Sequence, residues 1–517
     1  MMITHRDVRG PHREACDYVV VGSGPAGATA ARVLAEGGAE VVIIEEGAPW
    51  PLEKRGSALY PTMKGAWRDL GTNTAFGGAM IPILQGCAVG GTSVINSAIS
   101  WRLPEDVHAQ WSRDEGIADR LPYAEFDRVF TQLEHELNIR PVAPAVRGEL
   151  NNRMELGCER LGVTGHRIER NEEGCVGSGR CLQGCPSGAK LSMDRSFVPR
   201  AMRDGARVLA TCRVDKIRVE GGRAVGVGAH FRDPLRRRGG VPCEVEARRG
   251  VVVAASAIQS PILLKRSRIG NRSGQVGRNF QAHPGAGVVG LYDDDIEMWT
   301  GATQGYETVH FRDQGFKLET LALPPELAAA RLPGVGKELM ARLGDYRRMG
   351  LIAAQVRAAA QGRVGALPGG RPLIRYDLTP RDLKNLVRAM GVAAEIHFAA
   401  GAREVLLGIH GFAEVLRSPD ELRVLAGFEP RANQFSMIAT HLFGTCRMGS
   451  NPDHNVVGPN LESHDVSRLY VVDSSVFPTN LGVNPQCSIM ALSWLAAEGM
   501  LRDHARASLA KAPGYAG

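Results

Sequence analysis

The chain has 517 residues, which is too long for one compact core and predicts two structural units. Its hydrophobic content of 44% is that of a folded globular protein rather than a disordered one. The formal net charge of +7 is spread along the chain, and the densest basic cluster, Arg232 with Arg236–Arg238, is interrupted by Asp233 and Pro234, so we interpret it as a solvated loop and expect no nucleic-acid partner.

The N-terminal segment, Met1 to Cys16, is polar and charged and contains no apolar stretch of signal-peptide type. The sequence also lacks a run of about 18 apolar residues, so no transmembrane segment is expected. These features favour a cytoplasmic protein, in which the ten cysteines are thiols or metal ligands rather than disulfides. A periplasmic location, reached by export with a partner, is the alternative.

A dinucleotide-binding pattern opens the chain. An expected strand, Asp17–Val21, leads into Gly22-Ser23-Gly24-Pro25-Ala26-Gly27, and an Ala-rich helical stretch follows to Glu36. A second expected strand, Glu40–Ile44, ends at Glu45. This order of strand, glycine turn, helix and strand is the context in which a Gly-x-Gly-x-x-Gly motif binds a dinucleotide.

The residues of this motif have separate tasks. Gly22 permits the tight turn, Gly24 lets the backbone approach a pyrophosphate, and Gly27 allows close packing of the helix on the strand. The N-terminus of the helix offers unpaired N–H groups to the phosphates. Glu45 lies where a carboxylate accepts hydrogen bonds from the adenosine ribose, with Glu46 as the alternative. The candidate cofactor-binding residues of this region are Gly22, Gly24, Ala26, Gly27 and Glu45.

A second glycine-rich segment, Gly86–Asn96, offers another backbone turn for close approach and an amide side chain. One nucleotide-binding unit with additional glycine motifs fits a long cofactor such as FAD. The sequence holds no second complete Gly-x-Gly-x-x-Gly for a nicotinamide cofactor. This favours a flavoprotein that oxidises its substrate directly.

Three cysteines in the middle of the chain have ligand-like spacing. Cys175, Cys181 and Cys185 form the bacterial ferredoxin run C-x2-C-x2-C-x3-C-P with Ser178 in place of the second cysteine. Three thiolates suit a [3Fe–4S] cluster, which lacks one iron corner. Zinc would need a fourth ligand, for which His166 is the nearest candidate, and a thiol loop without metal is the third alternative.

The following segments alternate between strand and helix patterns. Val208–Val227 and Glu244–Ala254 show strand-like alternation, and Val251–Val253 is expected to be a buried strand. The Ala-rich and Arg-rich segments from Glu326 to Gln361 are interpreted as surface helices over a substrate pocket.

The C-terminal part carries two further glycine-rich motifs. His441–Gly449 and Gly482–Pro485 flank a strand-like run that ends at Asp473, and a helical run, Ser488–Met500, follows. A His and an Asn in such settings, together with the N-terminal nucleotide motif, indicate redox chemistry on a bound cofactor.

These segments together resemble the glucose–methanol–choline (GMC) family of flavin oxidoreductases over nearly the whole chain. Gly86–Asn96 is similar to the first family signature, Ser256–Leu264 to the second, and Val276–Pro284 to the stretch that follows it. The resemblance implies an α/β fold with a Rossmann-like FAD-binding domain and an interleaved α+β substrate domain. It implies FAD-binding segments at 14–130, 200–284 and 437–517, a cysteine-containing connection at 131–199, and a substrate domain at 285–436.

Two departures from the family pattern bear on the cofactor. The first signature often carries Arg where this chain has Cys87, so the local contact differs. Some members attach FAD through a His at the position of Ile95, so the resemblance implies non-covalent FAD. The further cofactor-binding residues that the resemblance implies are Gly91, Thr92, Asn96, Asp473 and Pro485.

The resemblance places the catalytic pair at His441 and Asn484. Oxidation of an alcohol needs a base for the hydroxyl proton, while flavin N5 accepts the hydride. A neutral imidazole suits the base, whereas an amide positions the hydroxyl by hydrogen bonding, so His441 transfers the proton and Asn484 aligns the substrate. The family likeness also directs the helix after Pro485 towards flavin N1 and Asp473 towards the ribityl-phosphate region.

The electron acceptor and the substrate stay open. The cysteine spacing also resembles the iron–sulfur-containing catalytic subunit of bacterial FAD-dependent glucose dehydrogenase, which would deliver electrons singly to an external carrier. Without a cluster, O2 or a quinone reoxidises the flavin. The rival hypotheses are a non-redox lyase with structural FAD and a subunit of a cytochrome-linked dehydrogenase complex. The small-molecule substrate is a sugar, polyol, sterol or aliphatic alcohol.

Overall fold

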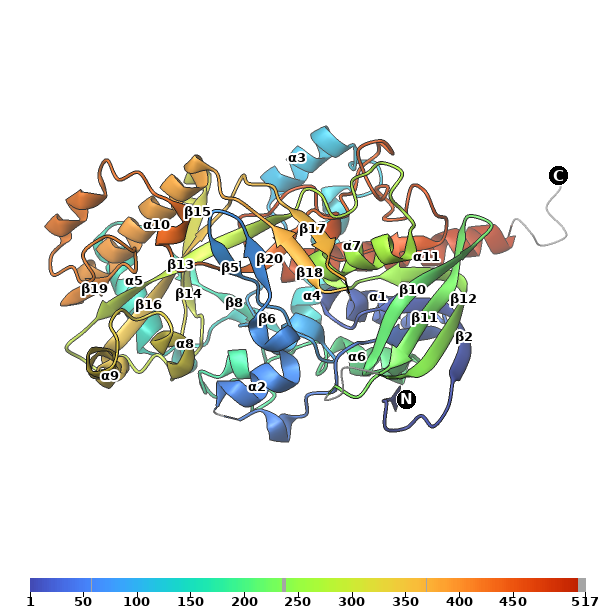
Figure 1. Cartoon of the computed structure of the whole chain (residues 1–517), viewed down its shortest axis with the longest axis horizontal. Coiled ribbons are helices and arrows are strands. Elements are labelled where there is room, and N and C mark those ends of the chain that lie inside the picture. The colour runs from blue at the N-terminus through green and yellow to red at the C-terminus, as the bar shows by residue number, and fades with distance from the viewer. Residues whose placement is uncertain (57, 235–238, 369, 510–517) are drawn as a thin grey trace.

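The computed structural model describes residues 1–56, 58–234, 239–368 and 370–509 (Figure 1). Arg236–Arg238 of the basic cluster lie outside these residues. Among the helices in the described part of the chain, none is long and apolar enough to cross a membrane.

The larger sheet is built from both ends of the sequence. Its strand order is β1-β9-β3-β2-β12-β11-β10, and β21 also pairs with β12. The central pairs β2–β3, β2–β12 and β12–β21 are parallel. The strands are β1 (Met2–Ile3), β2 (His12–Val21), β3 (Val41–Ile44), β9 (Arg207–Leu209), β10 (Cys212–Glu220), β11 (Arg223–Phe231), β12 (Val241–Val253) and β21 (Leu469–Val471).

Strand β2 begins five residues before the predicted start at Asp17. Its first part alternates between exposed and partly buried residues and pairs with Cys243–Ala247 of β12. Its last part is continuously buried, as is usual for a central parallel strand covered on both faces. The predicted buried strand Val251–Val253 lies beside it as the end of β12.

The second sheet has the order β19-β13-β16-β15-β14-β7, with β20 also paired to β13. Its strands are β7 (His166–Arg167), β13 (Gln281–Leu291), β14 (Tyr306–Thr308), β15 (Phe316–Thr320), β16 (Met349–Val356), β19 (Glu404–Leu406) and β20 (Ile438–Phe443). Smaller sheets join β17 (Arg363–Ala366), β18 (Pro372–Arg375), β4 (Thr74–Phe76) and β5 (Met80–Pro82), and β6 (Ile139–Pro141) with β8 (Glu169–Asn171).

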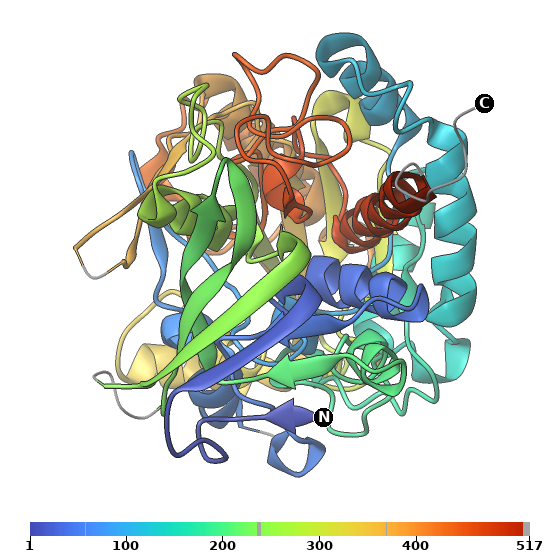
Figure 2. The same ribbon diagram turned by 90° about the vertical axis from the view of Figure 1, so that its right-hand side faces the viewer.

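The helices cover the faces of these sheets. Figure 2 shows α1 and α11 lying side by side along the larger sheet, and α10 packs on β13 and β16 of the second. The helices are α1 (Pro25–Glu36), α2 (Leu59–Ala66), α3 (Glu105–Glu115), α4 (Tyr123–Glu136), α5 (Glu149–Arg160), α6 (Phe197–Arg203), α7 (Ser256–Ser267), α8 (Pro325–Ala329), α9 (Lys337–Gly344), α10 (Pro380–Ala399) and α11 (Gln486–Leu509).

The prediction of surface helices from Glu326 to Gln361 is wrong in its second half. Helices α8 and α9 account for the first part, but Met349–Val356 forms β16, a strand with neighbours on both sides. The Ala and Leu residues of this segment are compatible with a helix, and burial between β13 and β15 selects the strand instead.

Candidate active site

One cavity of about 410 Å³ brings together the two glycine segments and the C-terminal motifs. Its walls contain every candidate cofactor and catalytic residue from the sequence except Gly27 and the cysteines. Residues from the start and the end of the chain meet there because β12 pairs with both β2 and β21. The cavity lining includes Gly22, Gly24, Ala26, Glu45, Gly91, Thr92, Asn96, His441, Asp473, Asn484 and Pro485.

The first glycine turn has no room for a side chain at Gly22 or at Gly27. Gly22 has φ +103°, and a Cβ there would lie 2.4 Å from the carbonyl oxygen of Ala254. A Cβ on Gly27 would lie 2.0 Å from the carbonyl oxygen of Gly22, so Gly27 serves helix–strand packing rather than the cavity wall. A Cβ on Gly91 would lie 2.7 Å from the Cα of Gly24. The two glycine segments therefore touch, and the backbone at the start of α1 is exposed to the cavity.

Glu45 is buried and held in a fixed orientation. Its Oε2 accepts hydrogen bonds from Ser23 N (3.0 Å) and Ser23 Oγ (2.7 Å), and its Oε1 accepts one from Gly47 N (2.8 Å). Burial raises the pKa of this carboxyl. The alternative, Glu46, forms an ion pair with Arg68 at 2.9 Å, although it also lines the cavity. Glu45 is thus the carboxylate fixed against the glycine turn.

Several polar atoms of the cavity wall have no hydrogen-bond partner among the described residues. Gln85 Oε1, Ser97 Oγ and Gln259 Nε2 are buried and form no hydrogen bond. Such groups are destabilising unless a ligand or water pairs with them. Together with the exposed backbone of the glycine turn, they fit an elongated polar ligand such as FAD.

Asp473 and Asn96 are held by neighbouring loops. Asp473 accepts hydrogen bonds from the backbone N–H groups of Ser256 (3.0 Å) and Ser475 (2.8 Å) and from the Ser260 hydroxyl (2.5 Å). It therefore fixes the start of α7 to the end of β21 while lining the cavity. Asn96 Nδ2 donates to Gln486 Oε1 at 2.6 Å. This contact links the second glycine segment to the first residue of α11, which begins two residues before the predicted start.

His441 and Asn484 face each other in this cavity. Asn484 Nδ2 lies 3.4 Å from His441 Nε2, and His441 Nδ1 lies 3.2 Å from His283 Nδ1 and 3.3 Å from Gln355 Nε2. The deep position of His441, and then the charge on Lys317, lower its pKa to about 3. His441 is therefore neutral at physiological pH. Its Nε2, on the side of Asn484, is the atom available to a substrate.

His283 is buried on β13 beside His441. Its Nε2 accepts a hydrogen bond from Gly482 N at 3.0 Å, and the side chain of Asn480 also lies against the ring. His283 is thus held between the backbone of Gly482 and the ring of His441.

The residues that sequence reasoning missed lie on the second sheet. His283 belongs to the family-like stretch Val276–Pro284, which was the available signal. Gln355 on β16 and Lys317 on β15 are register partners in adjacent strands, and each contacts one member of the catalytic pair. No motif marks either residue, because their function depends on strand pairing.

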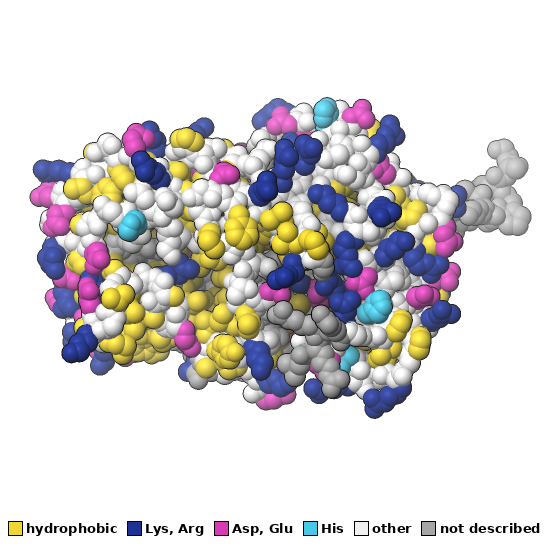
Figure 3. All heavy atoms as spheres, in the orientation of Figure 1, with side chains coloured by type: hydrophobic (Ala, Val, Ile, Leu, Met, Phe, Trp, Pro, Cys, Tyr) yellow, Lys and Arg dark blue, Asp and Glu magenta, His cyan; other side chains and the backbone are white. Residues whose placement is uncertain are grey.

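The apolar part of the cavity wall extends from Gln355. Leu351 and Ala353 point to the same face of β16 as Gln355, since side chains alternate along a strand. The other apolar residues of the wall include Leu84, Leu182, Leu321, Leu323, Leu327 and Ile438. On the outer surface, Figure 3 shows apolar side chains gathered over α8 and α9 and near α2 and β5, where Tyr60, Met80, Val335 and Met340 are exposed.

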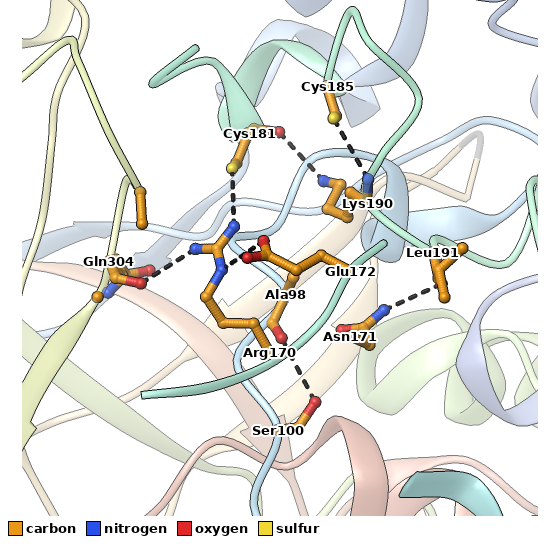
Figure 4. Close-up of polar contacts among 12 residues, drawn as sticks. Ala98, Ser100, Arg170, Asn171, Glu172, Cys181, Cys185, Lys190, Leu191 and Gln304 are labelled. Atoms are coloured by element: carbon orange, nitrogen blue, oxygen red, sulfur yellow. Dashed lines mark hydrogen bonds and ion pairs between the residues drawn. The ribbon is translucent and has the colours of Figure 1, made fainter. Parts of the chain in front are cut away.

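The expected three-thiolate site is not formed. Figure 4 shows Cys181 and Cys185 directed towards different partners: Arg170 Nη2 donates to Cys181 Sγ at 3.3 Å, and Lys190 N donates to Cys185 Sγ at 3.3 Å. Among the described residues, no three His, Cys, Asp or Glu side chains are grouped to hold a metal. Cys175 therefore does not complete a ligand set with the other two thiols.

The thiol of Cys181 lies in a charged environment. Arg170 also binds Glu172 Oε2 (2.8 Å) and the carbonyl oxygen of Gln304 (3.0 Å). Burial opposes ionisation of Cys181, but the charges of Arg170 and then Lys190 outweigh it, and the pKa of the thiol is lowered. The zinc alternative also fails, since His166 Nε2 lies 3.4 Å from Glu307 Oε1 instead. In the loop that contains Cys181 and Cys185, both thiols accept hydrogen bonds from neighbouring residues.

Comparison with known proteins identifies the family. Profiles described as GMC oxidoreductase match residues 16–285 and 361–493. The chain is 35% identical to a GMC-type oxidoreductase of Mycobacterium tuberculosis, covering 93% of this chain and 75% of that one. It is 27% identical to a long-chain-alcohol oxidase of Arabidopsis thaliana, covering 96% and 68%.

Solved structures show the same α/β fold. Pyridoxine 4-oxidase from Mesorbium loti superposes with a TM-score of 0.71 at 20% identity, covering 95% of this chain and 99% of that one. Formate oxidase gives a TM-score of 0.71 at 15% identity, covering 96% and 100%. The predicted fold class is confirmed.

Proposed function

Because the chain belongs to the GMC oxidoreductase family of flavoproteins, we propose that it oxidises an apolar primary or secondary alcohol to the aldehyde or ketone with non-covalent FAD. The observation that carries this proposal is the placement of His441 and Asn484, 3.4 Å apart, in the cavity that also contains the dinucleotide turn. Bound FAD would accept the hydride from the alcohol carbon at N5.

Several residues of the chain fit the phosphates and ribose of this cofactor. Backbone N–H groups at Gly24 and at the start of α1 would bind the pyrophosphate, and Glu45 would accept hydrogen bonds from the ribose. Gly91, Thr92 and Asn96 would contact the cofactor from the second glycine segment, and the N-terminus of α11 after Pro485 would favour negative charge on the flavin ring. We also propose that residues 14–130, 200–284 and 437–517 form the FAD-binding domain and that residues 285–436 form the substrate-binding domain.

His441 removes the hydroxyl proton at Nε2. Its low pKa keeps the imidazole neutral and therefore able to take up a proton, and His283 Nδ1 lies 3.2 Å from its Nδ1. Asn484 donates from Nδ2 to the alcohol oxygen and aligns it.

The substrate class follows from the wall around the catalytic pair. Leucine and alanine side chains line the cavity beyond Gln355, so an alcohol with a hydrocarbon chain gains favourable burial while a sugar would lose hydrogen bonds to water. The long-chain-alcohol oxidases among the relatives support the same class.

The test is anaerobic bleaching of the flavin by a panel of straight-chain alcohols, glucose and a sterol. We expect kcat/KM to rise with chain length, by up to about fourfold per methylene, until the cavity is filled. His441→Gln should lower kcat by about 10²- to 10⁴-fold and leave flavin binding intact. Bound flavin that no alcohol bleaches would contradict the proposal and favour a lyase. O2 uptake during turnover then separates an oxidase from an enzyme that needs a quinone or a cytochrome.

A further inference from the structure

Lys317 is a fully buried cation held between two carboxylates. Its Nζ lies 2.6 Å from Glu307 Oε2 and 2.8 Å from Glu319 Oε2. Glu307 on β14 is directly opposite Glu319 on β15 in the sheet register, an arrangement that is unfavourable without a cation between them. Burial disfavours the ammonium, but the carboxylates, Glu307 first, outweigh it and raise the pKa of Lys317. Lys317 is therefore charged at physiological pH.

The carboxylates have further partners of their own. Glu307 Oε1 accepts a hydrogen bond from Trp101 Nε1 at 2.8 Å, and Glu319 Oε1 accepts one from Gln304 Nε2 at 2.8 Å. Such a buried ionic network contributes little net stability, since well-packed apolar residues often do as well. The two carboxylates require a cation between them, but folding stability alone does not account for the network as a whole.

The third contact of Lys317 is with Asn484 of the proposed catalytic pair. Its Nζ donates a hydrogen bond to Asn484 Oδ1 at 2.5 Å. Because an ammonium can only donate, the oxygen of the Asn484 amide must face Lys317. The Nδ2 group is thereby turned towards His441 Nε2 and the cavity. In the strand beside Lys317, Gln355 contacts the other nitrogen of His441.

We propose that Lys317 is a positioning residue that fixes the Asn484 amide with its N–H group towards the alcohol oxygen. This inference rests on the proposed function. A reversed amide would present Oδ1 to the substrate, accept the hydroxyl proton as a hydrogen bond and compete with His441 for it. Lys317 thus makes Asn484 a donor only, which is the role that an oxygen losing its proton requires.

The test uses a charge-balanced variant. Lys317→Met with Glu319→Gln removes one positive and one negative charge, and Glu307 keeps its contact with Trp101. The matched control is Lys384→Met with Glu429→Gln, which removes an exposed pair at 3.0 Å far from the cavity. Flavin content and the thermal midpoint are measured first, and a further variant, Lys317→Arg, serves if the charge-balanced protein does not fold.

The decisive readout is a double-mutant cycle with Asn484→Leu. We expect the charge-balanced variant to lower kcat about 100-fold with KM changed less than about threefold. In the Asn484→Leu background the same change should lower kcat by less than about threefold, because the amide through which Lys317 acts is absent. Equal losses in both backgrounds, or wild-type kcat in the variant, would overturn the proposal. Lys317→Arg keeps the charge but displaces the donor, and wild-type kcat there would overturn it as well.

The orientation of the amide can also be determined without turnover. A crystal structure of the variant at a resolution that distinguishes nitrogen from oxygen is expected to show Asn484 reversed or in two orientations. The wild-type orientation in the variant would overturn the inference even if activity were lost. Failure of the proposed function is separate, because the wild-type protein itself would then not be reduced by any alcohol.

Discussion

Lowering the pH tests whether the ring of His441 is neutral. The structure lowers the pKa of this ring from about 6.5 to about 3, so at pH 5 about 1% of the rings carry a second proton. With an unperturbed pKa, about 97% would be protonated at pH 5, and the fraction of active base would fall about 30-fold relative to pH 8. Reduction of the flavin by alcohol should therefore be nearly constant from pH 8 to pH 5.

The assay is kcat/KM for a medium-chain alcohol from anaerobic stopped-flow traces between pH 5 and pH 8. The exposed His454 serves as the control, since His454→Gln should leave the profile unchanged. An acid limb with a midpoint near pH 6.5, in protein that remains folded and flavin-loaded, would refute the conclusion that burial and Lys317 keep His441 neutral.

The remaining predictions concern stability, the glycine turn and the cysteine loop. Burial lowers the pKa of His397 to about 4. Because the unfolded chain takes up a proton on this ring below about pH 6.5 and the folded protein does not, the free energy of unfolding should fall by about 3 kcal/mol between pH 6.5 and pH 4. Urea unfolding at both pH values should show a smaller difference in His397→Gln, and an equal difference would contradict this. Gly22→Ala should destabilise the protein by about 2 kcal/mol and reduce bound flavin, because its Cβ meets a carbonyl oxygen at 2.4 Å. Gly222→Ala, also at positive φ but without a close neighbour, is the matched control for both measurements. Anaerobically purified protein should contain no stoichiometric iron or acid-labile sulfide, and iron that disappears in Cys181→Ser would contradict the hydrogen-bonded thiol loop.

The N-terminal unit could be predicted from sequence because its determinants are local. The glycine spacing, the Ala-rich helix and the apolar strands lie within 30 residues, and α1 ends at Glu36 as expected. The early start of β2 could not be predicted, since its partner residues in β12 lie more than 200 positions away.

Only those residues of the candidate site that belong to a recognisable sequence motif could be predicted. His441 and Asn484 were found through family-like segments, and the cavity places them together. The sequence pattern places Gln355 in a helix and does not distinguish Lys317 from other lysines, because the contacts of both residues arise from the pairing of β15 with β16. The cysteine spacing is typical of metal ligands. Arg170 and Lys190, which donate hydrogen bonds to the thiols in the structure, belong to no sequence motif.

Strand β12 lies between β2 and β21, so the first and last parts of the chain share one central strand. During synthesis, the glycine turn leaves the ribosome hundreds of residues before the strand and helix that complete its cavity. The nascent protein must therefore keep an unfinished nucleotide pocket until α11 has emerged and packed on α1. We therefore expect flavin to bind only after α11 has emerged, and a chain that stops before Gln486 should be released empty.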